Sequence, residues 1–289
     1  MVSVFFTYQF QDTKWTSSLF EIAKKSALLL ILFASLFISN FIVKKNALTK
    51  DSAYTIFFVL IFLMFFPNVL DNYKLIVSNF FILLAMRRLV SLQTLKAPKE
   101  KIFDASLWIF VASLFHFWAI LFILLVYISI IFHVSRDYRN WLIPFVALFS
   151  SSIIFVFYAL LFDKEVIGVY LQSEVINLQV NYFTNNYQNI AFSIYAVFAV
   201  FFVLPYLFTL TNKPLNLQAS YKKVLLAFFI GIAIFFITAN KSNEVLIYTF
   251  LPMAIMATNT VEYLQNKIQQ EIILFVSIIC GVFCFFSQL

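Results

Sequence analysis

Nine long apolar runs, separated by short polar segments, set the architecture of this chain. They cover residues 26–43, 53–70, 75–86, 103–133, 140–162, 189–210, 224–238, 245–261 and 272–286. Most of them approach the roughly 20 apolar residues that a helix needs to cross the hydrocarbon core of a bilayer. The chain is 63% apolar and 11% charged, whereas a soluble domain is about 25% charged. The sequence therefore predicts an all-α, multi-pass membrane protein and excludes a soluble globular, coiled-coil or disulfide-rich chain.

The organisation of the chain is simple, because no linker, repeat or low-complexity tract interrupts the runs. Residues 1–25 form a polar and aromatic N-terminal segment without the basic start and apolar stretch of a signal peptide. Residues 26–289 are expected to form a single transmembrane domain. Its longest hydrophilic stretch, 163–188, spaces its apolar residues on one helical face, which predicts an outer loop with an interfacial helix.

The run 103–133 decides the topology. As one helix it would be about 46 Å long at 1.5 Å per residue, against a hydrocarbon core of about 30 Å. The alternative is a hairpin with a turn near residues 116–118, and the bias of Lys and Arg toward the cytoplasmic side distinguishes the two. A hairpin places 14 Lys and Arg inside and six outside, whereas a single span places ten on each side. We therefore expect short paired helices here and about ten membrane segments.

Two lysines conflict with this orientation. Lys24 and Lys25 directly precede the first run, and lysines in this position normally keep that end of a helix inside. A further span upstream would remove the conflict. We therefore expect either an unusual chain start or an exceptional first helix.

Several stretches resemble a family of multi-span inner-membrane proteins of Bacteroidetes. The matching pieces are NFIVKKNALT (40–49), FFPNVLDNYKLIVSNFFILLAMRRLVSL (65–92), KIFDASLWIFVASLFHFWAILFILLVY (101–127), YRNWLIPFVALF (138–149) and, more weakly, FLPMAIMATNTVEYL (250–264). The resemblance implies a bacterial inner-membrane location. The family has no assigned activity to transfer, and its members begin with an extra apolar span that this sequence lacks.

A second, weaker similarity concerns the pattern ASLWIFVASLFHFWAILFILL (105–125). It is similar to the paired short helices of C-type membrane glycosyltransferases, which move a sugar from a polyprenyl-phosphate donor at the outer leaflet. In those enzymes the catalytic acid lies in the first large outer loop, and the first outer segment here offers Asp12 and Glu21. Because the similarity covers one hairpin, it is an analogy at the level of fold.

Six residues form the candidate polar site at the outer face: His116, Asp163, Glu165, Glu174, Lys241 and Glu244. His116 is the one titratable group well inside an apolar run, where ionisable residues are candidates for function. It is either a phosphate contact or proton-linked group, or an ordinary residue of the turn. The carboxylates and Lys241 could handle a sugar phosphate or could form a solvated rim.

A second set of candidates lies at the inner face: Arg87, Arg88, Lys96, Lys99, Lys101, Arg136 and Arg139. These cations either bind anionic lipid headgroups or a partner protein, or only determine topology. Nucleic-acid binding is not expected, because the cations are spread over short loops. Asp104 is expected to cap the start of its helix.

We expect no metal and no cofactor. Two His and two Cys provide no metal-ligand set, and Cys280 and Cys284 share one helix face as small core residues. Three glycines cannot build a phosphate-binding loop.

Three functional hypotheses remain. The chain is a non-catalytic subunit or scaffold of an envelope assembly, in contact with membrane lipids and partner membrane proteins; or a polyprenyl-phosphate-dependent transferase of the C type; or a small-solute transporter. We favour the first hypothesis, because so few titratable groups lie within the apolar runs. Enzymatic activity remains open.

Overall fold

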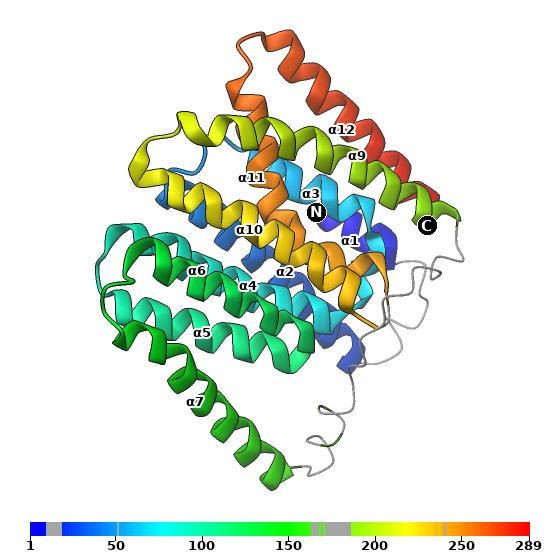
Figure 1. Cartoon of the computed structure of the whole chain (residues 1–289). Helices are drawn as coiled ribbons and strands as arrows, with labels where there is room; N and C mark the ends of the chain where they lie inside the picture. The colour runs from blue at the N-terminus through cyan, green and yellow to red at the C-terminus, as the bar shows by residue number, and fades with distance from the viewer. Residues whose placement is uncertain (10–18, 51, 163–167, 169, 171–185, 240) are drawn as a thin grey trace.

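The computed structural model describes residues 1–9, 19–50, 52–162, 168, 170, 186–239 and 241–289, and all regular structure among them is helical (Figure 1). The α-helices are α1 (Val2–Gln9), α2 (Leu19–Lys45), α3 (Tyr54–Phe65), α4 (Tyr73–Val90), α5 (Pro98–Phe115), α6 (Ile123–His133), α7 (Arg139–Phe162), α9 (Asn186–Thr209), α10 (Leu215–Ile237), α11 (Ile247–Tyr263) and α12 (Lys267–Ser287). Short 3-10 helices are η2 (Pro67–Asp71), η3 (Ser91–Thr94), η4 (Phe117–Phe122), η5 (Leu210–Asn212) and η6 (Asn243–Leu246).

Seven stretches are long and apolar enough to cross a membrane, as the composition predicts. They are Leu19–Lys45, Tyr73–Thr94, Arg139–Phe162, Asn186–Asn212, Leu217–Ile237, Asn243–Tyr263 and Lys267–Ser287. The first of these begins seven residues before the apolar run that starts at residue 26, so part of the predicted N-terminal segment is the first two turns of α2. The predicted outer loop and interfacial helix at 163–188 lie almost entirely outside the described residues.

The predicted hairpin at 103–133 is confirmed. The helix α5 ends at Phe115, His116 takes an extended backbone conformation, and the chain returns through η4 and α6. The two arms pack against each other and against α4. Each arm has 17 or 18 residues, so with a rise of about 1.5 Å per residue in the α-helices and about 2.0 Å in η4 neither arm exceeds about 30 Å. The run therefore forms two short antiparallel helical arms and not one long helix.

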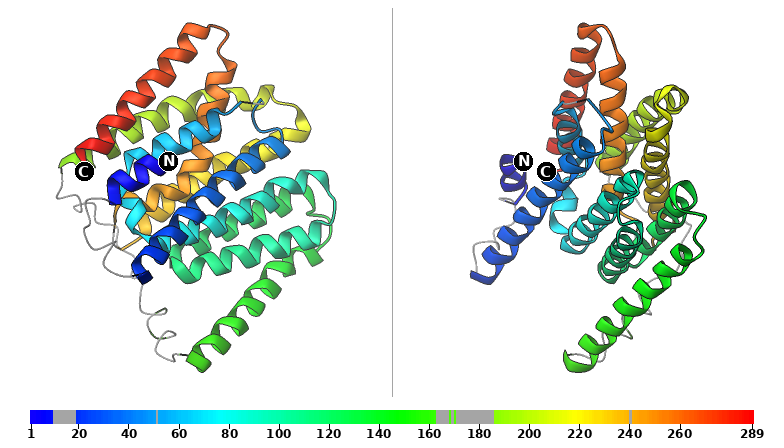
Figure 2. Two further views of the ribbon diagram at one scale, coloured as in Figure 1. Left: turned by 180° about the vertical axis from the view of Figure 1, so that it is seen from behind. Right: turned by 90° about the vertical axis from the view of Figure 1, so that its left-hand side faces the viewer.

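Hydrogen bonds between loops define two ends of the bundle. At one end, which we call the basic end, Gln93 donates to the carbonyl of Asn46, and Ser220 donates to Gln93. At the opposite end, Asn72 donates to Glu244 at 2.7 Å. Successive helices from α2 to α7 and from α9 to α12 run alternately between these two ends (Figures 1 and 2).

The helix α11 forms the centre of the bundle and is buried along nearly its whole length. It packs against α3, α4, α9 and α10. Aromatic rings fill the space around it: Phe66 stacks on Phe250 with ring centroids 6.2 Å apart, and Tyr195 meets Phe66 edge-on at 5.3 Å. This packing accounts for part of the unusual content of 40 Phe.

One glycine permits the close approach of α10 to α11. A Cβ atom at Gly231 would lie 2.7 Å from the Cγ2 atom of Thr249. The side chain of Thr249 is itself fixed, because its hydroxyl lies 2.6 Å from both the carbonyl of Leu246 and the hydroxyl of Tyr195. The two helices therefore contact each other at a distance that only glycine allows.

Two helices stand at opposite edges of the molecule. The helix α7 packs mainly against α5 and α6, and α12 packs mainly against α3, with fewer contacts to α9 and α11. Both lean away from the central helices (Figures 1 and 2). Most of the large apolar side chains of α7 are exposed on the surface of the protein.

Candidate functional site

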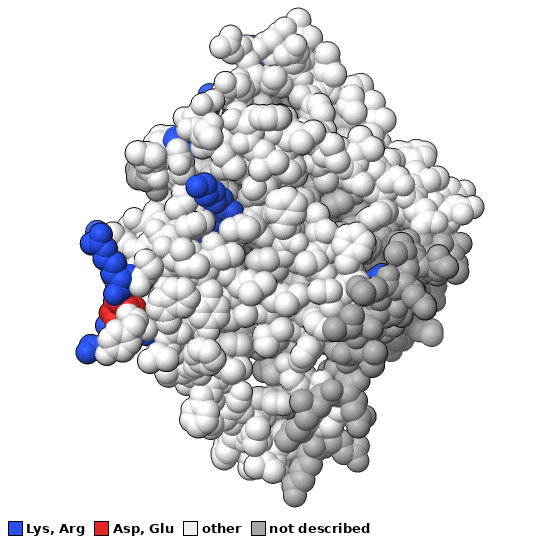
Figure 3. Space-filling model, in the orientation of Figure 1, with Lys and Arg blue, Asp and Glu red and all other residues white. Residues whose placement is uncertain are grey.

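All seven cations of the predicted inner set lie at the basic end. Arg87 and Arg88 occupy the last turns of α4, Lys99 and Lys101 begin α5, and Arg139 begins α7. Lys96 lies just before α5, and Arg136 lies just after α6. In the space-filling view, Lys and Arg side chains gather along the left edge of the molecule together with a few carboxylates (Figure 3). The structure therefore brings the predicted cations to one face.

Two ion pairs link segments of this face. Arg88 pairs with Asp104 at 2.8 Å, and Lys99 pairs with Asp137 at 3.3 Å. The expectation that Asp104 caps its helix is wrong, because α5 already begins at Pro98 and Asp104 lies in the second turn. The backbone amide of Arg139 donates to Asp137, and this bond and Lys99 hold the pKa of that carboxyl below its ordinary value.

Other cations of this face are held by neutral groups. Arg87 and Lys45 lie over the ring of Phe41, at 4.7 and 4.9 Å from its centroid. The ammonium of Lys101 donates to the carbonyl of Ser91 at 2.7 Å and to Thr94 at 2.8 Å. These contacts spread the charge over the surface of the basic end.

A buried lysine joins three helices below the basic face. Lys223 of α10 has 0% exposed surface. Its ammonium donates to the carbonyl of Leu89 at 2.6 Å, in the last turn of α4, and lies 3.1 Å from Nε2 of His133 in α6. A cation near a helix C-terminus interacts favourably with the helix dipole. The sequence shows Lys223 only as one of several lysines in a loop region, so its burial could not be foreseen.

A polar pocket opens beside this face, and sequence reasoning missed it. It has a volume of about 180 Å³ and is lined by Ala47, Thr49, Lys50, Lys213, Tyr221, Asn259, Glu262 and Tyr263. These residues come from the α2–α3 connection, the segment between α9 and α10, the beginning of α10, and the end of α11. Their wide separation along the chain leaves no local signal in the sequence.

At the opposite end, the described members of the predicted outer set occupy separate positions. His116 faces Tyr248 of α11, with ring centroids 5.6 Å apart, and its two ring nitrogens are buried without a hydrogen-bond partner among the described residues. Glu244 accepts a hydrogen bond from Asn72. Lys241 is buried in the connection after α10. Asp163, Glu165 and Glu174 lie outside the described residues.

A polar network at this end centres on Asp71, a residue that the sequence marks only as part of a turn. Tyr8 donates to Asp71 at 2.9 Å and Gln9 donates to it at 3.1 Å. Lys25 pairs with the same carboxylate at 3.4 Å and also donates to Gln9. The network ties α1 and the start of α2 to the turn between α3 and α4. The neighbouring Asn72 caps α4 by accepting from the amide of Leu75.

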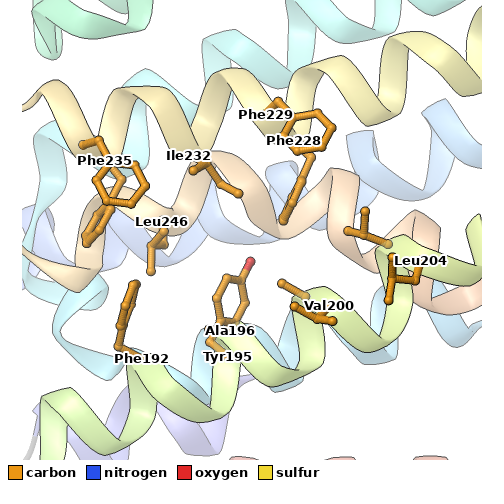
Figure 4. A pocket seen from close by; sticks show the side chains of 13 residues that line it. Phe192, Tyr195, Ala196, Val200, Leu204, Phe228, Phe229, Ile232, Phe235 and Leu246 are labelled. Carbon is orange, nitrogen blue, oxygen red and sulfur yellow. The ribbon is translucent and has the colours of Figure 1, made fainter. Parts of the chain in front are cut away.

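An apolar groove of about 360 Å³ lies between α9 and α10 (Figure 4). Phe192, Ala196, Val200 and Leu204 line it from α9, and Phe228, Phe229, Ile232 and Phe235 line it from α10. Tyr195 presents its ring to the groove, while its hydroxyl bonds to Thr249. The side chains that line the groove are therefore apolar or aromatic.

Comparison with known proteins places the chain in a family. The model of DUF6427, a family of unknown function, matches residues 1–289. The chain belongs to DUF6427. Neither the curated proteins nor the solved structures contain a significant match. For this member of DUF6427, functional inference therefore depends on its own side chains and their contacts.

Proposed function

We propose that this chain is an integral protein of the bacterial inner membrane with ten membrane segments and its basic end in the cytoplasm. Seven of these segments would be the long stretches described above. The other three would be the shorter helical arms α3, α5 and η4–α6. The distribution of charge supports this orientation, because 14 Lys and Arg lie at the basic end. At the opposite end, the described residues include Lys24, Lys25, Lys74 and Lys241. Positive residues are enriched in cytoplasmic loops.

We infer that the chain acts as a non-catalytic subunit or scaffold of an envelope assembly. The observation that carries this inference is the packed interior around α11. The polar side chains of that helix bond within the protein: Tyr248 donates to Ser78 at 2.7 Å, Thr258 meets Thr55 at 3.1 Å, and Asn259 donates to the carbonyl of Leu48 at 2.9 Å. A centre occupied by aromatic rings and satisfied polar groups supports binding at the surface of the protein.

The helix α7 is the surface that we propose for a partner membrane protein. It carries Phe145, Phe149 and Phe157 on exposed positions, and among the described helices it packs mainly against α5 and α6. Helices in membranes associate through close packing of such faces. The helix lies at an edge of the described bundle (Figure 2).

Photocrosslinking in native membranes tests this proposal. A photoreactive phenylalanine analogue would replace Phe149 of α7, which is 69% exposed, and in a matched control would replace Phe37 of α2, which is 72% exposed. We expect a discrete protein adduct at position 149 and only lipid adducts at position 37. Lipid adducts alone at both positions, with a monodisperse monomer in mild detergent, would refute the scaffold role.

The groove between α9 and α10 favours a second candidate function, a polyprenyl-phosphate-dependent transferase of the C type. Its apolar lining suits a polyprenyl chain. Replacing Ala199, which lines the groove, with Phe would fill this space. If the protein binds polyprenyl phosphate, Ala199→Phe should abolish that binding, whereas Val197→Phe, on the same helix beside a different pocket, should not. Transport is the third candidate, and flux of solutes in proteoliposomes would test it.

A further inference from the structure

The polar pocket at the basic end is built around the ammonium of Lys213. Its Nζ donates to Oδ1 of Asn259 at 3.1 Å and lies 4.8 Å from the centre of the Tyr221 ring. Both partners are fixed. Asn259 directs its Nδ2 to the carbonyls of Leu48 and Ile255, each at 2.9 Å, and the hydroxyl of Tyr221 donates to the carbonyl of Leu48 at 2.8 Å. The positive charge is therefore positioned by neutral groups.

A second ammonium lies on the same pocket. Nζ of Lys50 donates to the carbonyl of Glu262 at 3.1 Å, near the end of α11. The carboxylate of Glu262 accepts from the backbone amide of Lys50 at 2.8 Å and from the hydroxyl of Ser52. Within the part of the chain that the structure describes, neither ammonium lies within 4 Å of a carboxylate oxygen. Among the described residues that line the pocket, two lysines and one glutamate give a net charge of about +1 at neutral pH.

The surroundings of Lys213 favour an anion. Desolvation by burial lowers the pKa of Lys213, and repulsion from Lys50 lowers it further, while attraction to Glu262 opposes both effects. A bound anion would offset the desolvation and the repulsion at once. Lysine is a common phosphate ligand, because it offers three donors on a single charge. The pocket also opens where α9 and α11 end and α10 begins, which is the level of lipid headgroups in a membrane orientation.

We propose that this pocket binds a phosphate group, with Lys213 and Lys50 as its cationic ligands and an anionic phospholipid headgroup as the source of the phosphate. The site is separate from the seven cations of the basic face, which lie over α4, α5 and α7. It is also independent of the scaffold role, because it needs no partner protein.

Native mass spectrometry of the full chain in mild detergent tests the proposal. Phosphatidylglycerol would be titrated against phosphatidylcholine, which carries no net charge. A separate arm would titrate inorganic phosphate and glycerol phosphate. Loss of one charge-assisted hydrogen bond corresponds to a weakening of about tenfold or more. We expect this loss of phosphatidylglycerol affinity in Lys213→Gln and an increase in affinity in Glu262→Gln, because that change removes a negative charge from the pocket.

Lys222→Gln provides the matched control. Lys222 is the neighbour of Tyr221 on α10, carries the same charge and lies near the ring of Phe132, outside the pocket. We expect it to bind phosphatidylglycerol with wild-type affinity. The expected gain of phosphatidylglycerol affinity in Glu262→Gln could not result from misfolding of that variant, since a misfolded variant would not bind more tightly.

The outcomes separate the two sources of phosphate. Preference for phosphatidylglycerol that depends on Lys213 supports the lipid as occupant. Binding of soluble phosphate alone, with the same dependence, supports the pocket but overturns the lipid assignment. Equal affinities of Lys213→Gln and the wild-type chain, or equal losses in Lys213→Gln and Lys222→Gln, would overturn the proposal.

Discussion

The contact between Gly231 and Thr249 allows a sharp test of the packing in the centre of the bundle. In Gly231→Ala, the new Cβ atom would meet Cγ2 of Thr249 at 2.7 Å, about 0.7 Å short of the 3.4 Å at which ordinary contact begins. The Thr249 side chain cannot rotate without loss of its bonds to Leu246 and Tyr195. We expect the variant to fold with a reduced free energy of unfolding.

The size of the effect follows from three terms. Overpacking of a filled interior costs about 1–3 kcal/mol. Loss of the Tyr195–Thr249 hydrogen bond adds about 1 kcal/mol, and the better helix propensity of Ala returns about 1 kcal/mol. The net loss is about 1–3 kcal/mol. For chains of 150–250 residues, 1 kcal/mol corresponds to about 2–4 °C in Tm, so the midpoint should fall by several degrees.

The assay is thermal unfolding of the purified chain in one mild detergent, followed by the fraction that remains monodisperse. Gly281→Ala is the matched control, because its Cβ atom would lie at an ordinary 3.4 Å from the Ile61 side chain. We expect the Tm of that variant to equal or slightly exceed the wild-type value. Thr249→Ser removes Cγ2 but keeps the hydroxyl, so it should restore much of the loss in the Gly231→Ala background.

Two results would refute this reasoning. One is a Gly231→Ala variant as stable as the Gly281→Ala variant. The other is a double variant, with Ala at 231 and Ser at 249, whose losses simply add. Residues in direct contact are expected to give non-additive changes, so additivity would mean that the two side chains do not meet.

Three further predictions concern single side chains. Tyr248→Phe removes the bond to Ser78 and should lower the free energy of unfolding by about 1 kcal/mol, measured by thermal unfolding; an unchanged Tm would contradict that bond. His116→Phe replaces two buried ring nitrogens that have no described partner. The free energy of unfolding, followed by folded yield and Tm, should therefore stay the same or rise by about 1 kcal/mol. A loss of folded protein would reveal a polar partner. Asp137 has a lowered pKa in the folded chain, so its contacts stabilise above its ordinary pKa of about 4, and this contribution disappears as the pH falls through the lowered value. Asp137→Asn should therefore flatten the decline of Tm on acidification, and an unaltered slope would contradict the stabilising contacts of Asp137 with the amide of Arg139 and with Lys99.

The sequence predicts those parts of the fold that depend on local pattern and on the sum of charges. The hairpin around His116 follows from the length of one apolar run and from the bias of Lys and Arg, and both are properties of the sequence alone. The gathering of Arg87, Arg88 and Arg139 at one end follows from the same bias. These predictions required no knowledge of which helices are neighbours.

The candidate sites could not be predicted in the same way, because they depend on contacts between distant residues. Lys213 and Asn259 are 46 residues apart, and Lys50 and Glu262 are 212 residues apart. Nothing in the spacing of these residues indicates that they share a pocket. Lys223 likewise resembles its neighbour Lys222 in the sequence, yet Lys223 is buried between Leu89 of α4 and His133 of α6, whereas Lys222 is exposed.

The ion pair between Lys25 and Asp71 has a consequence for the biogenesis of the protein. The helix α2 carries two lysines near each end, Lys24 and Lys25 at one and Lys44 and Lys45 at the other, so its own charges give the insertion machinery no preferred direction. Asp71 belongs to the turn between α3 and α4 and is synthesised 46 residues after Lys25. The partner that neutralises Lys25 therefore emerges from the ribosome only after α2. We expect α2 to acquire its final orientation late, once α3 and α4 have entered the bilayer as a pair.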